Sequence, residues 1–504
     1  MTTNDKKYPK RILIVGYRIL NWLYILIIPI LRNRFSTKFL VIAPLGVKND
    51  FMKVLNKEDE FITYDDQLED MCSHGFNKDL GKEEKIAREI EKKYSINYMR
   101  DIIQQDRSLS ASFLSYSPKY IWNKSRLSNN QNLIKLVNGY VKYTEEIIEK
   151  YQNIDMAFVW PVDGLSATMS NIFESRGVKV TYPYNSKYKS FGFWVNNAFQ
   201  DSSKLEKSFK NTTFKQIISE ENLQPPETGW TDTRKMDNTF STKSLLKNLI
   251  KTILFRVEFL LIDLIKFDFT KKKRISLLSS LSFHINSWSL YRTLGKISER
   301  SITSFDQKPF LFYALPLEPE FSVQARCKEF NDQKSIIKLL ALNMPAGYDL
   351  VIKEHSDIGR RDKSFYTELL KLPNIKMAHP SLRGIDLVKK ARSVATMAGT
   401  VSLEATMMGK RVIEFSLHSS FSFLNNIFTV KEISKLKDIV SLAMENLDNN
   451  TKEKIRQDGS RLPEAIMNIS FEAENTPLFY GNNTALSKKE LNKSVDLLIE
   501  TFNE

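Results

Sequence analysis

Residues 393–415, SVATMAGTVSLEATMMGKRVIEF, decide the fold of the second half of the chain. The short apolar run Ser393–Met397 predicts a buried strand. Thr400–Met408 has helical spacing and stops at Gly409, and Arg411–Phe415 predicts another buried strand. Two strands joined by a helix within so few residues are typical of a parallel sheet with helical crossovers.

The residues before this stretch repeat the alternation of strand and helix. Strands are predicted at 309–315, 348–353 and 375–378, and helices at 332–343, 364–372 and 384–392. Five strand–helix units within about 110 residues predict a Rossmann-like domain.

The first half of the chain predicts a second α/β domain. Lys38–Pro44, Ile154–Trp160 and Val178–Tyr182 are short apolar runs that favour buried strands, and the polar residues 201–242 indicate a boundary. We therefore expect an α/β protein with two Rossmann-like domains facing a cleft, followed by C-terminal helices. The expected parts are a basic apolar segment (1–35), an N-terminal domain (36–230), a linker with an apolar basic helix (231–300), a C-terminal domain (301–430) and C-terminal helices (431–504).

The composition excludes several protein classes. With 42% hydrophobic and 11% aromatic residues in 504, the chain has ample apolar surface to bury, which excludes a wholly disordered protein. It has no series of apolar stretches long enough for a polytopic membrane protein. Two cysteines, Cys72 and Cys327, cannot form a disulfide framework or a zinc cluster, which favours a reducing compartment. Five scattered histidines show no metal-ligand spacing, so no metal site is expected.

The formal net charge of +15 is concentrated in two segments. Residues 1–35 carry seven Lys or Arg and one acid, and residues 243–274 carry nine and three, so each has a net charge of +6. In both segments the basic residues flank apolar runs, whereas a nucleic-acid groove spreads them over a folded face. We therefore expect a membrane surface as a partner, and no nucleic acid.

Each basic segment also has a second interpretation. The run 12–31 is interrupted by Arg18 and contains Pro29, so attachment to a membrane surface, a buried helix or strand, and a true span all stay open. No small-residue cleavage site follows it, which argues against a signal peptide. The second run, Ser244–Phe269, suits either acidic lipid headgroups or a packed inter-domain helix.

Two predicted strand ends carry polar residues suited to a nucleotide. Lys353, Glu354 and His355 follow one strand, at the position that lines the crevice of an open α/β sheet. Gly399, Thr400 and Ser402 follow another strand, where free backbone N–H groups at the start of a helix favour a phosphate. An ordinary strand-end histidine and an ordinary threonine N-cap are the structural alternatives.

The second half resembles the capsule-polysaccharide biosynthesis family, which includes bacterial Kdo transferases and related GT-B glycosyltransferases. The resemblance covers about residues 309–416 and rests on LPLEPE (315–320), Asp332-Gln333, MPAGYDLVIKEH (344–355) and GTVSLEATMMGKRVIEF (399–415). It implies a nucleotide-sugar donor, no bound cofactor and no metal. It implies donor binding by His355, Thr400 and Ser402. We expect the same site to include Lys353, Glu354, Arg360, Arg361, Gly399 and Glu404.

The resemblance also implies a catalytic base in the N-terminal half. Asp163-Gly164 follows a predicted strand and is similar to the acidic-residue–Gly motif that holds the base in related sialyltransferases, so Asp163 is the predicted base. Together with His355 of the donor site, it completes the pair of predicted catalytic residues. A turn-forming Asp-Gly is the alternative, and Gln105-Asp106-Arg107 is a second candidate for the base.

The chain departs from the family pattern at two points. Ser356 stands where proline is usual, and the later pair His379-Pro380 is a rival for the nucleotide histidine. A glutamate common near the equivalent of Tyr182–Tyr184 is missing.

These residues predict a glycosyltransferase that moves a sugar to a capsular polysaccharide or a lipid-linked glycan, in the cytoplasm at the inner face of the plasma membrane. A nucleotide-sugar epimerase, an alcohol-phosphate transferase and a catalytically degenerate module of polysaccharide assembly are the alternatives.

Overall fold

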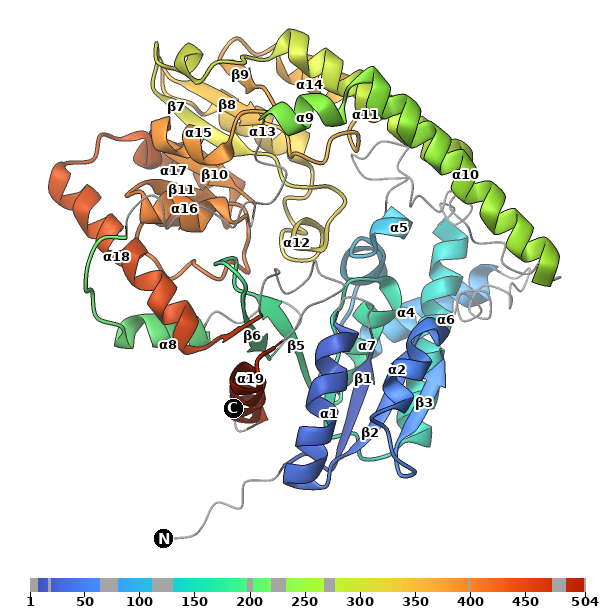
Figure 1. Cartoon of the computed structure of the whole chain (residues 1–504). Helices are drawn as coiled ribbons and strands as arrows, with labels where there is room; N and C mark the ends of the chain where they lie inside the picture. Colours follow the sequence, from blue (N-terminus) through green and yellow to red (C-terminus); the bar gives the residue numbers. More distant parts are fainter. Residues whose placement is uncertain are drawn as a thin grey trace. The chain divides into compact units, whose positions relative to one another are not determined.

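The computed structural model divides the chain into two compact units (Figure 1). The N unit consists of residues 1–106, 126–213 and 462–504, and the C unit of residues 107–125 and 214–461. The structure describes residues 8–16, 20–63, 80–110, 130–196, 203–218, 233–266, 277–397, 399–473 and 486–502.

The N unit is built on a seven-stranded sheet with the order β13-β6-β5-β4-β1-β2-β3. The pairs from β5 through β4, β1 and β2 to β3 are parallel, while β6 and β13 are added antiparallel. The strands are β1 (Arg11–Val15), β2 (Lys38–Ala43), β3 (Glu60–Thr63), β4 (Met156–Phe158), β5 (Lys179–Asn185), β6 (Phe191–Val195) and β13 (Phe471–Glu472).

The C unit has a six-stranded, all-parallel sheet with the order β12-β11-β10-β7-β8-β9. Counted from the first strand of each unit, both sheets contain the order 3-2-1-4-5-6 that defines a Rossmann fold. The prediction of two Rossmann-like domains is therefore confirmed. The strands are β7 (Phe310–Ala314), β8 (Asp349–Lys353), β9 (Ile375–Ala378), β10 (Ser393–Thr396), β11 (Arg411–Glu414) and β12 (Ile427–Thr429).

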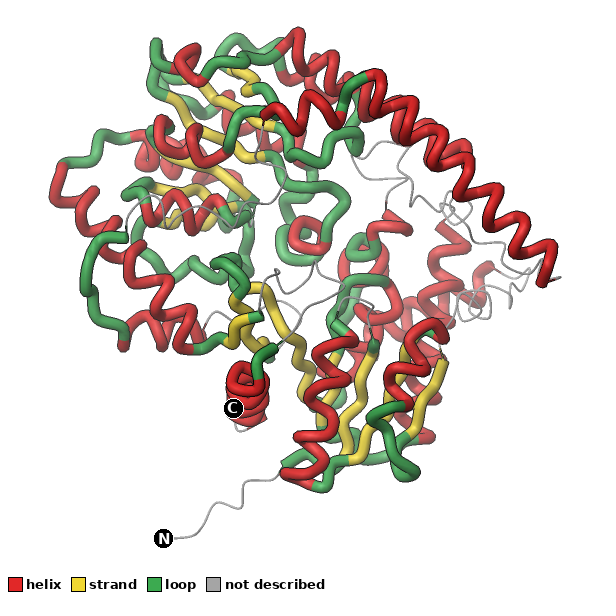
Figure 2. Tube along the Cα trace, viewed as in Figure 1, coloured by secondary structure: helices red, strands yellow, loops and turns green. Residues whose placement is uncertain are grey.

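Helices connect the strands and flank the sheets (Figure 2). In the N unit they are α1 (Asn21–Phe35), α2 (Lys48–Met52), α4 (Leu80–Tyr94), a π-helical turn (Tyr98–Ile103), α6 (Asn130–Lys150), α7 (Gly164–Ser175), α8 (Ser203–Asn211) and α19 (Lys488–Phe502). In the C unit they are α5 (Arg107–Ser110), α9 (Thr233–Thr239), α10 (Thr242–Lys266), α11 (Leu277–Ile297), α12 (Phe321–Gln324), α13 (Gln333–Leu342), α14 (Lys363–Leu369), α15 (Gly384–Lys390), α16 (Val401–Met407) and α17 (Leu436–Met444), and α18 (Asn449–Asn468) contains the boundary between the units.

β1 and α1, the described parts of the apolar run 12–31, belong to the core of the N unit, so the prediction of a membrane-proximal segment at 1–35 is wrong for them. β1 lies between β2 and β4 in the middle of the sheet, and Ile12, Leu13 and Ile14 are completely buried. On α1, Tyr24, Ile27 and other apolar side chains are completely buried against the same sheet. Burial of this apolar surface stabilises the unit, and it leaves none of these side chains for a lipid.

Two further boundaries differ from the predicted ones. Most of α11 belongs to the C unit, because Leu290, Tyr291 and Leu294 are part of its hydrophobic core rather than of a linker. Residues 462–504 belong to the N unit, where β13 pairs with β6 and α19 contacts both α1 and β6. Within the described residues, no helix is long and apolar enough to cross a membrane.

Candidate functional site

The carboxyl ends of β7, β8 and β10 form the candidate site of the C unit. β7 lies between β8 and β10. The chain continues from β7 to β8 and β9 on one side of it, and then crosses from β9 to β10 on its other side, which makes the end of β7 the topological switch point where open α/β sheets bind ligands. Neighbouring strands are about 4.8 Å apart, so the ends of β8 and β10 are separated by roughly 10 Å. His355 follows β8, and Gly399 and Thr400 follow β10.

His355 presents one ring nitrogen as a donor. Its Nδ1 accepts a hydrogen bond from the backbone N–H of Asp357 at 3.1 Å, so the neutral ring carries its proton on Nε2. Among the described residues Nε2 has no partner. Burial lowers the pKa of the imidazole, with Glu354 opposing this shift, so the neutral ring with a free Nε2–H predominates at pH 7.

A buried ionic network holds the loops around His355. Arg361, which is 2% exposed, donates from Nε to Glu318 at 2.9 Å, from one terminal nitrogen to Glu354 at 2.8 Å and from the other to the Pro316 carbonyl at 2.8 Å. Glu354 also accepts from the Tyr366 hydroxyl and, at 2.6 Å, from the backbone N–H of His355. Although burial acts to lower it, the carboxylates of Glu354 and Glu318 raise the pKa of Arg361 above its usual value. The network ties the ends of β7 and β8 to α14.

This network changes the roles predicted for three residues. The donors of Arg361 are occupied by Glu318, Glu354 and a carbonyl, so its charge is compensated inside the network and is not free for a phosphate. Glu354 faces the same network and positions His355 rather than a ligand. Arg360 is ion-paired with Asp357 three residues earlier.

The turn after β10 divides its polar groups between the interior and the surface. Ser402 is completely buried and donates to Glu414 on β11, which corrects the prediction that its hydroxyl binds a phosphate. Thr400 is exposed, and its hydroxyl has no partner among the described residues. Gly399 lies close to Thr396, whose Oγ1 accepts from its N–H at 3.3 Å and would be 3.0 Å from an added Cβ.

Glu404, one turn into α16, carries a carboxyl group that is mostly buried. Burial alone raises the pKa of Glu404 to about 7, and the carboxyl has no partner in the part of the chain that the structure describes. Lys353 lies at the end of β8, where burial lowers the pKa of its ammonium group to about 8 and its Nζ donates to the Glu354 carbonyl at 3.2 Å. A ligand that offers hydroxyl groups would satisfy the Glu404 carboxylate.

His379, the rival nucleotide histidine, belongs to the core. It is completely buried, its Nδ1 pairs with the Ser381 hydroxyl at 2.6 Å, and its ring meets Tyr291 of α11 edge to face. Burial and the neighbouring Arg300 lower the pKa of His379 to about 4. This environment favours His355 as the ligand-binding histidine.

The two acidic candidates of the N unit lie together at the start of α7. Asp163 is its N-cap: Oδ1 accepts from the Ser166 N–H and hydroxyl, both at 2.8 Å, and the Asp163 N–H donates to Ser166 Oγ at 3.1 Å. Asp106, which is 5% exposed, accepts from the Gly164 N–H at 3.1 Å. The helix-capping alternative is therefore correct for Asp163, although its partly exposed carboxylate still lies at the carboxyl end of β4.

Sequence patterns did not reveal Asn21 at the first turn of α1. It is 4% exposed, and both its amide nitrogen and its amide oxygen have no partner among the described residues. An added Cβ at Gly16, directly after β1, would lie 2.9 Å from the Asn21 oxygen and 2.6 Å from Ala43. An isolated asparagine in an apolar helix carries no recognisable pattern, so only Gly16 within the apolar run could have indicated this place.

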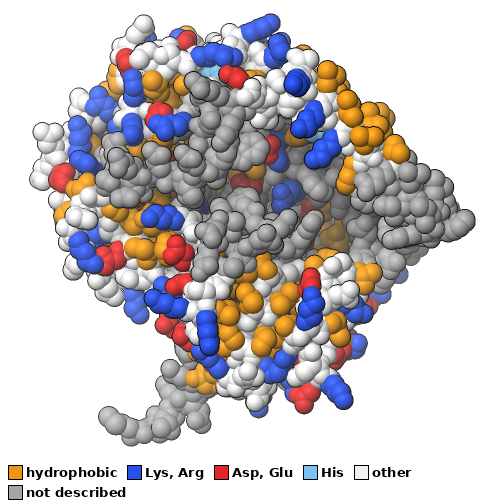
Figure 3. All heavy atoms as spheres, viewed as in Figure 1, with side chains coloured by type: hydrophobic (Ala, Val, Ile, Leu, Met, Phe, Trp, Pro, Cys, Tyr) orange, Lys and Arg blue, Asp and Glu red, His pale blue; other side chains and the backbone are white. Residues whose placement is uncertain are grey.

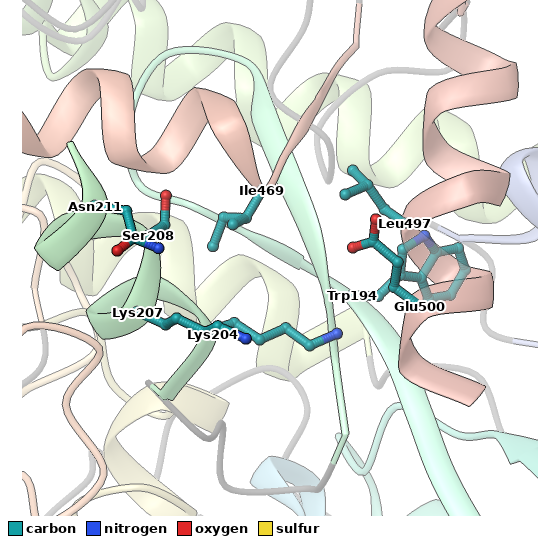
Figure 4. A pocket seen from close by; sticks show the side chains of 8 residues that line it. All are labelled: Trp194, Lys204, Lys207, Ser208, Asn211, Ile469, Leu497 and Glu500. Atoms are coloured by element: carbon teal, nitrogen blue, oxygen red, sulfur yellow. The ribbon is translucent and has the colours of Figure 1, made fainter. Parts of the chain in front are cut away.

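A small pocket in the N unit lies away from these strand ends. Its volume is about 230 Å³, and its wall includes Trp194 of β6, Lys204 and Lys207 of α8, and Leu497 and Glu500 of α19. The Lys204 side chain extends toward Trp194 and Glu500 (Figure 4). Trp194 itself is bound to α19, because its Nε1 donates to the Ser494 carbonyl at 2.9 Å. The pocket therefore belongs to the contact between α8, β6 and α19.

Comparison with known proteins gives matches only among solved structures. No protein-family model matches the chain, and no curated protein matches it. The calicheamicin glycosyltransferase CalG4 is 11% identical, with 91% of this chain and 95% of that chain covered and a TM-score of 0.29. The beta Kdo 2,7 transferase KpsC of Thermosulfurimonas dismutans is 12% identical, with 71% and 89% covered and a TM-score of 0.33. A putative UDP-N-acetylglucosamine 2-epimerase of Listeria monocytogenes is 8% identical, with 98% and 97% covered and a TM-score of 0.26.

Proposed function

We propose that the protein is a glycosyltransferase that moves a sugar from a nucleotide-sugar donor to a surface polysaccharide or a lipid-linked glycan. The observation that carries the proposal is the set of available polar groups at the switch point of the C unit: the Nε2–H of His355, the Thr400 hydroxyl and the Glu404 carboxyl. His355 follows β8, while Thr400 and Glu404 follow β10, and the ends of these two strands are roughly 10 Å apart. Two donors and a carboxylate at this spacing fit the phosphates and the ribose of one nucleotide.

In this proposal the C unit binds the donor. His355 Nε2 and the Thr400 hydroxyl donate to phosphate oxygens, and Glu404 accepts hydrogen bonds from ribose hydroxyls. The ammonium group of Lys353 lies next to His355 in sequence and adds positive charge near the phosphates. Gly399 lets the ligand approach the backbone after β10.

The N unit supplies the acceptor site and the base. The acceptor hydroxyl attacks the anomeric carbon, the bond from that carbon to the nucleotide's phosphate oxygen breaks, and the nucleotide leaves with the bond's electrons. Asp163 takes the proton of the attacking hydroxyl, and the Nε2–H of His355 stabilises the charge that develops on the leaving phosphate.

Calorimetric titration with UDP-, CMP- and GDP-sugars tests the donor site. We expect one class to bind, and we expect His355→Ala and Thr400→Val each to weaken its affinity by about 10- to 100-fold, because each removes one hydrogen bond to a charged oxygen. His418→Gln, a partly buried histidine elsewhere in the C unit, is the matched control and should bind like the wild type. Undiminished affinity in both variants would refute the assignment of these residues.

The reaction is tested by incubation of the bound donor with and without glycan acceptors. Transfer that requires an acceptor supports the proposal. Conversion of the donor sugar without any acceptor would instead indicate an epimerase, and the absence of binding to every nucleotide would indicate a degenerate module.

A further inference from the structure

Helix α10 of the C unit has an unusual outward surface. Six of the eighteen exposed large apolar side chains among the described residues lie within twelve residues of this helix: Leu246, Ile250, Ile253, Leu254, Phe255 and Val257. Their exposed fractions range from 43 to 63%. Exposed apolar side chains scattered singly are normal, but a contiguous stripe marks an interaction surface.

Contacts with α11 define which side of α10 faces inward. The Thr252 hydroxyl lies 3.2 Å from Nε2 of His284 on α11, and Leu245, Leu249 and Arg256 share the Thr252 side of the helix and are only partly exposed. At 100° per residue, Leu246, Ile250, Ile253, Leu254 and Val257 fall on the opposite side, within an arc of about 100°. The stripe therefore points away from the body of the C unit.

A row of lysines borders this stripe. Lys243, Lys247 and Lys251 are spaced by four residues, so they form a row that begins within the apolar arc at Lys243 and continues past its edge through Lys247 and Lys251, and all three are exposed. No acidic residue occurs between Lys243 and Val257. Figure 3 shows the hydrophobic side chains gathered along α10, with Lys and Arg beside them. A hollow of about 680 Å³ lies between the lysine row and the apolar side chains of Leu246, Ile250, Leu254 and Phe255.

We propose that this α10 surface, made of the lysine row and the apolar stripe, docks the protein on the surface of an anionic lipid bilayer. An apolar face bordered by lysines is the pattern of helices that lie in the plane of a membrane interface, where the apolar side chains enter the acyl boundary and the ammonium groups meet anionic headgroups. The run from Lys243 to Val257 is about 22 Å long, enough for several headgroup contacts.

The charge of the surface favours a lipid over a second copy of the chain. Two copies paired through this face would bring two lysine rows together with no acidic residue from either run 243–257 to compensate them. An anionic bilayer satisfies the lysines and the apolar stripe at the same time.

Vesicle flotation of the full-length protein tests the proposal. We expect it to float with vesicles of phosphatidylcholine mixed with phosphatidylglycerol, to bind pure phosphatidylcholine vesicles much more weakly, and to lose affinity as salt is raised. The triple variant K243Q/K247Q/K251Q should bind the mixed vesicles about 100-fold more weakly, at about fivefold per lysine. The double variant I250Q/L254Q should bind at least about tenfold more weakly, and glutamine preserves the helix.

Matched controls separate docking from general effects. K431Q/K437Q/K454Q removes three exposed lysines elsewhere in the C unit, and L342Q replaces a leucine that is 71% exposed; both should bind vesicles like the wild type. All variants should keep the unfolding temperature and the nucleotide affinity of the wild type. Equal loss of binding in the controls, or no binding of the wild type to the mixed vesicles, would overturn the proposal. It would also fail if I250Q/L254Q dissolved an oligomer in sedimentation analysis without affecting vesicle binding, since the face would then join two copies.

Discussion

The two Rossmann-like units share a strand order but differ in what their strand ends do with polar side chains. At the carboxyl edge of the C unit, His355 Nε2, the Thr400 hydroxyl and the Glu404 carboxyl have no partners among the described residues. At the corresponding edge of the N unit, Asp163 and Asp106 are hydrogen-bonded to the first turn of α7. In the N unit the two carboxylates bind a helix start and the unpartnered amide of Asn21 is buried, whereas the Thr400 hydroxyl of the C unit is exposed, so strand order alone does not identify a binding edge.

The largest expected effect comes from the network that holds the C-unit edge. Arg361→Leu leaves Glu318 and Glu354 buried without their cation, which should destabilise the protein by about 3–5 kcal/mol in urea unfolding. Arg360→Leu is the neighbouring control: its pair with Asp357 is partly exposed and should cost at most about 1 kcal/mol. Equal losses in the two variants would mean that the network does not stabilise this edge.

Variants of Asp163 test whether this residue acts as the catalytic base in addition to capping α7. Asparagine caps helices about as well as aspartate but is a far weaker proton acceptor, so Asp163→Asn should keep the stability of the wild type and lower the transfer rate at least about 100-fold. Asp163→Ala should lower both. If Asp163→Asn transferred sugar at the wild-type rate, Asp163 would be a cap only, and Asp106→Asn would be the next variant to assay.

Glu404 should make the donor affinity of the C unit depend on pH. Because burial raises the pKa of Glu404 to about 7, its carboxyl is largely protonated at pH 6 and ionised at pH 8. If the carboxylate accepts from ribose hydroxyls, donor affinity should rise about tenfold from pH 6 to pH 8 and level off above that. Calorimetry at several pH values measures this rise.

As pH rises, the free energy of unfolding of the ligand-free protein should fall, whereas the donor affinity rises. A raised pKa means that the folded state holds the proton more tightly, so Glu404 makes the protein less stable as pH rises from about 4.5 to about 7, with no further loss above. Glu404→Gln should therefore unfold at a higher temperature than the wild type at pH 8, yet bind the donor more weakly and without the pH dependence. A wild-type affinity that is flat between pH 6 and pH 8 would contradict the role of Glu404.

The smallest expected effect concerns the α7 cap itself. Ser166→Ala removes the hydroxyl that bonds Asp163 in both directions, which should cost about 1 kcal/mol in unfolding free energy. The transfer rate should stay within about twofold of the wild type, because Ser166 takes no part in the proposed proton transfer. A rate loss as large as that of Asp163→Asn would show that the orientation of Asp163 depends on this hydroxyl.

Periodicity predicted the fold well because strand and helix periods are local properties. The strands at the carboxyl edge of the C unit, and with them the place of His355, follow from apolar runs of four to six residues. The roles of Arg361 and Ser402 do not follow in the same way. Their partners Glu318 and Glu414 are 43 and 12 residues away in sequence, and only the folded sheet brings them within hydrogen-bonding distance.

Composition could not separate the two apolar basic segments. Residues 12–31 and 244–269 both combine apolar runs with flanking cations, yet Ile27 and Ile28 of α1 are completely buried while Ile250 and Leu254 of α10 are more than half exposed. A core helix and an interfacial helix need the same apolar side chains, and they differ only in whether a sheet covers them. The three-dimensional arrangement therefore decides which segment is available to a membrane.

The return of the chain to the N unit has a consequence for how the protein is made. Trp194 of β6 needs Phe471 beside its ring and the Ser494 carbonyl for its indole N–H, although about 300 residues separate it from Ser494. During synthesis the ribosome completes the whole C unit before these residues emerge, so the first unit to be translated is the last to be completed. Until then β6 lacks its outer partner strand and exposes an unpaired edge.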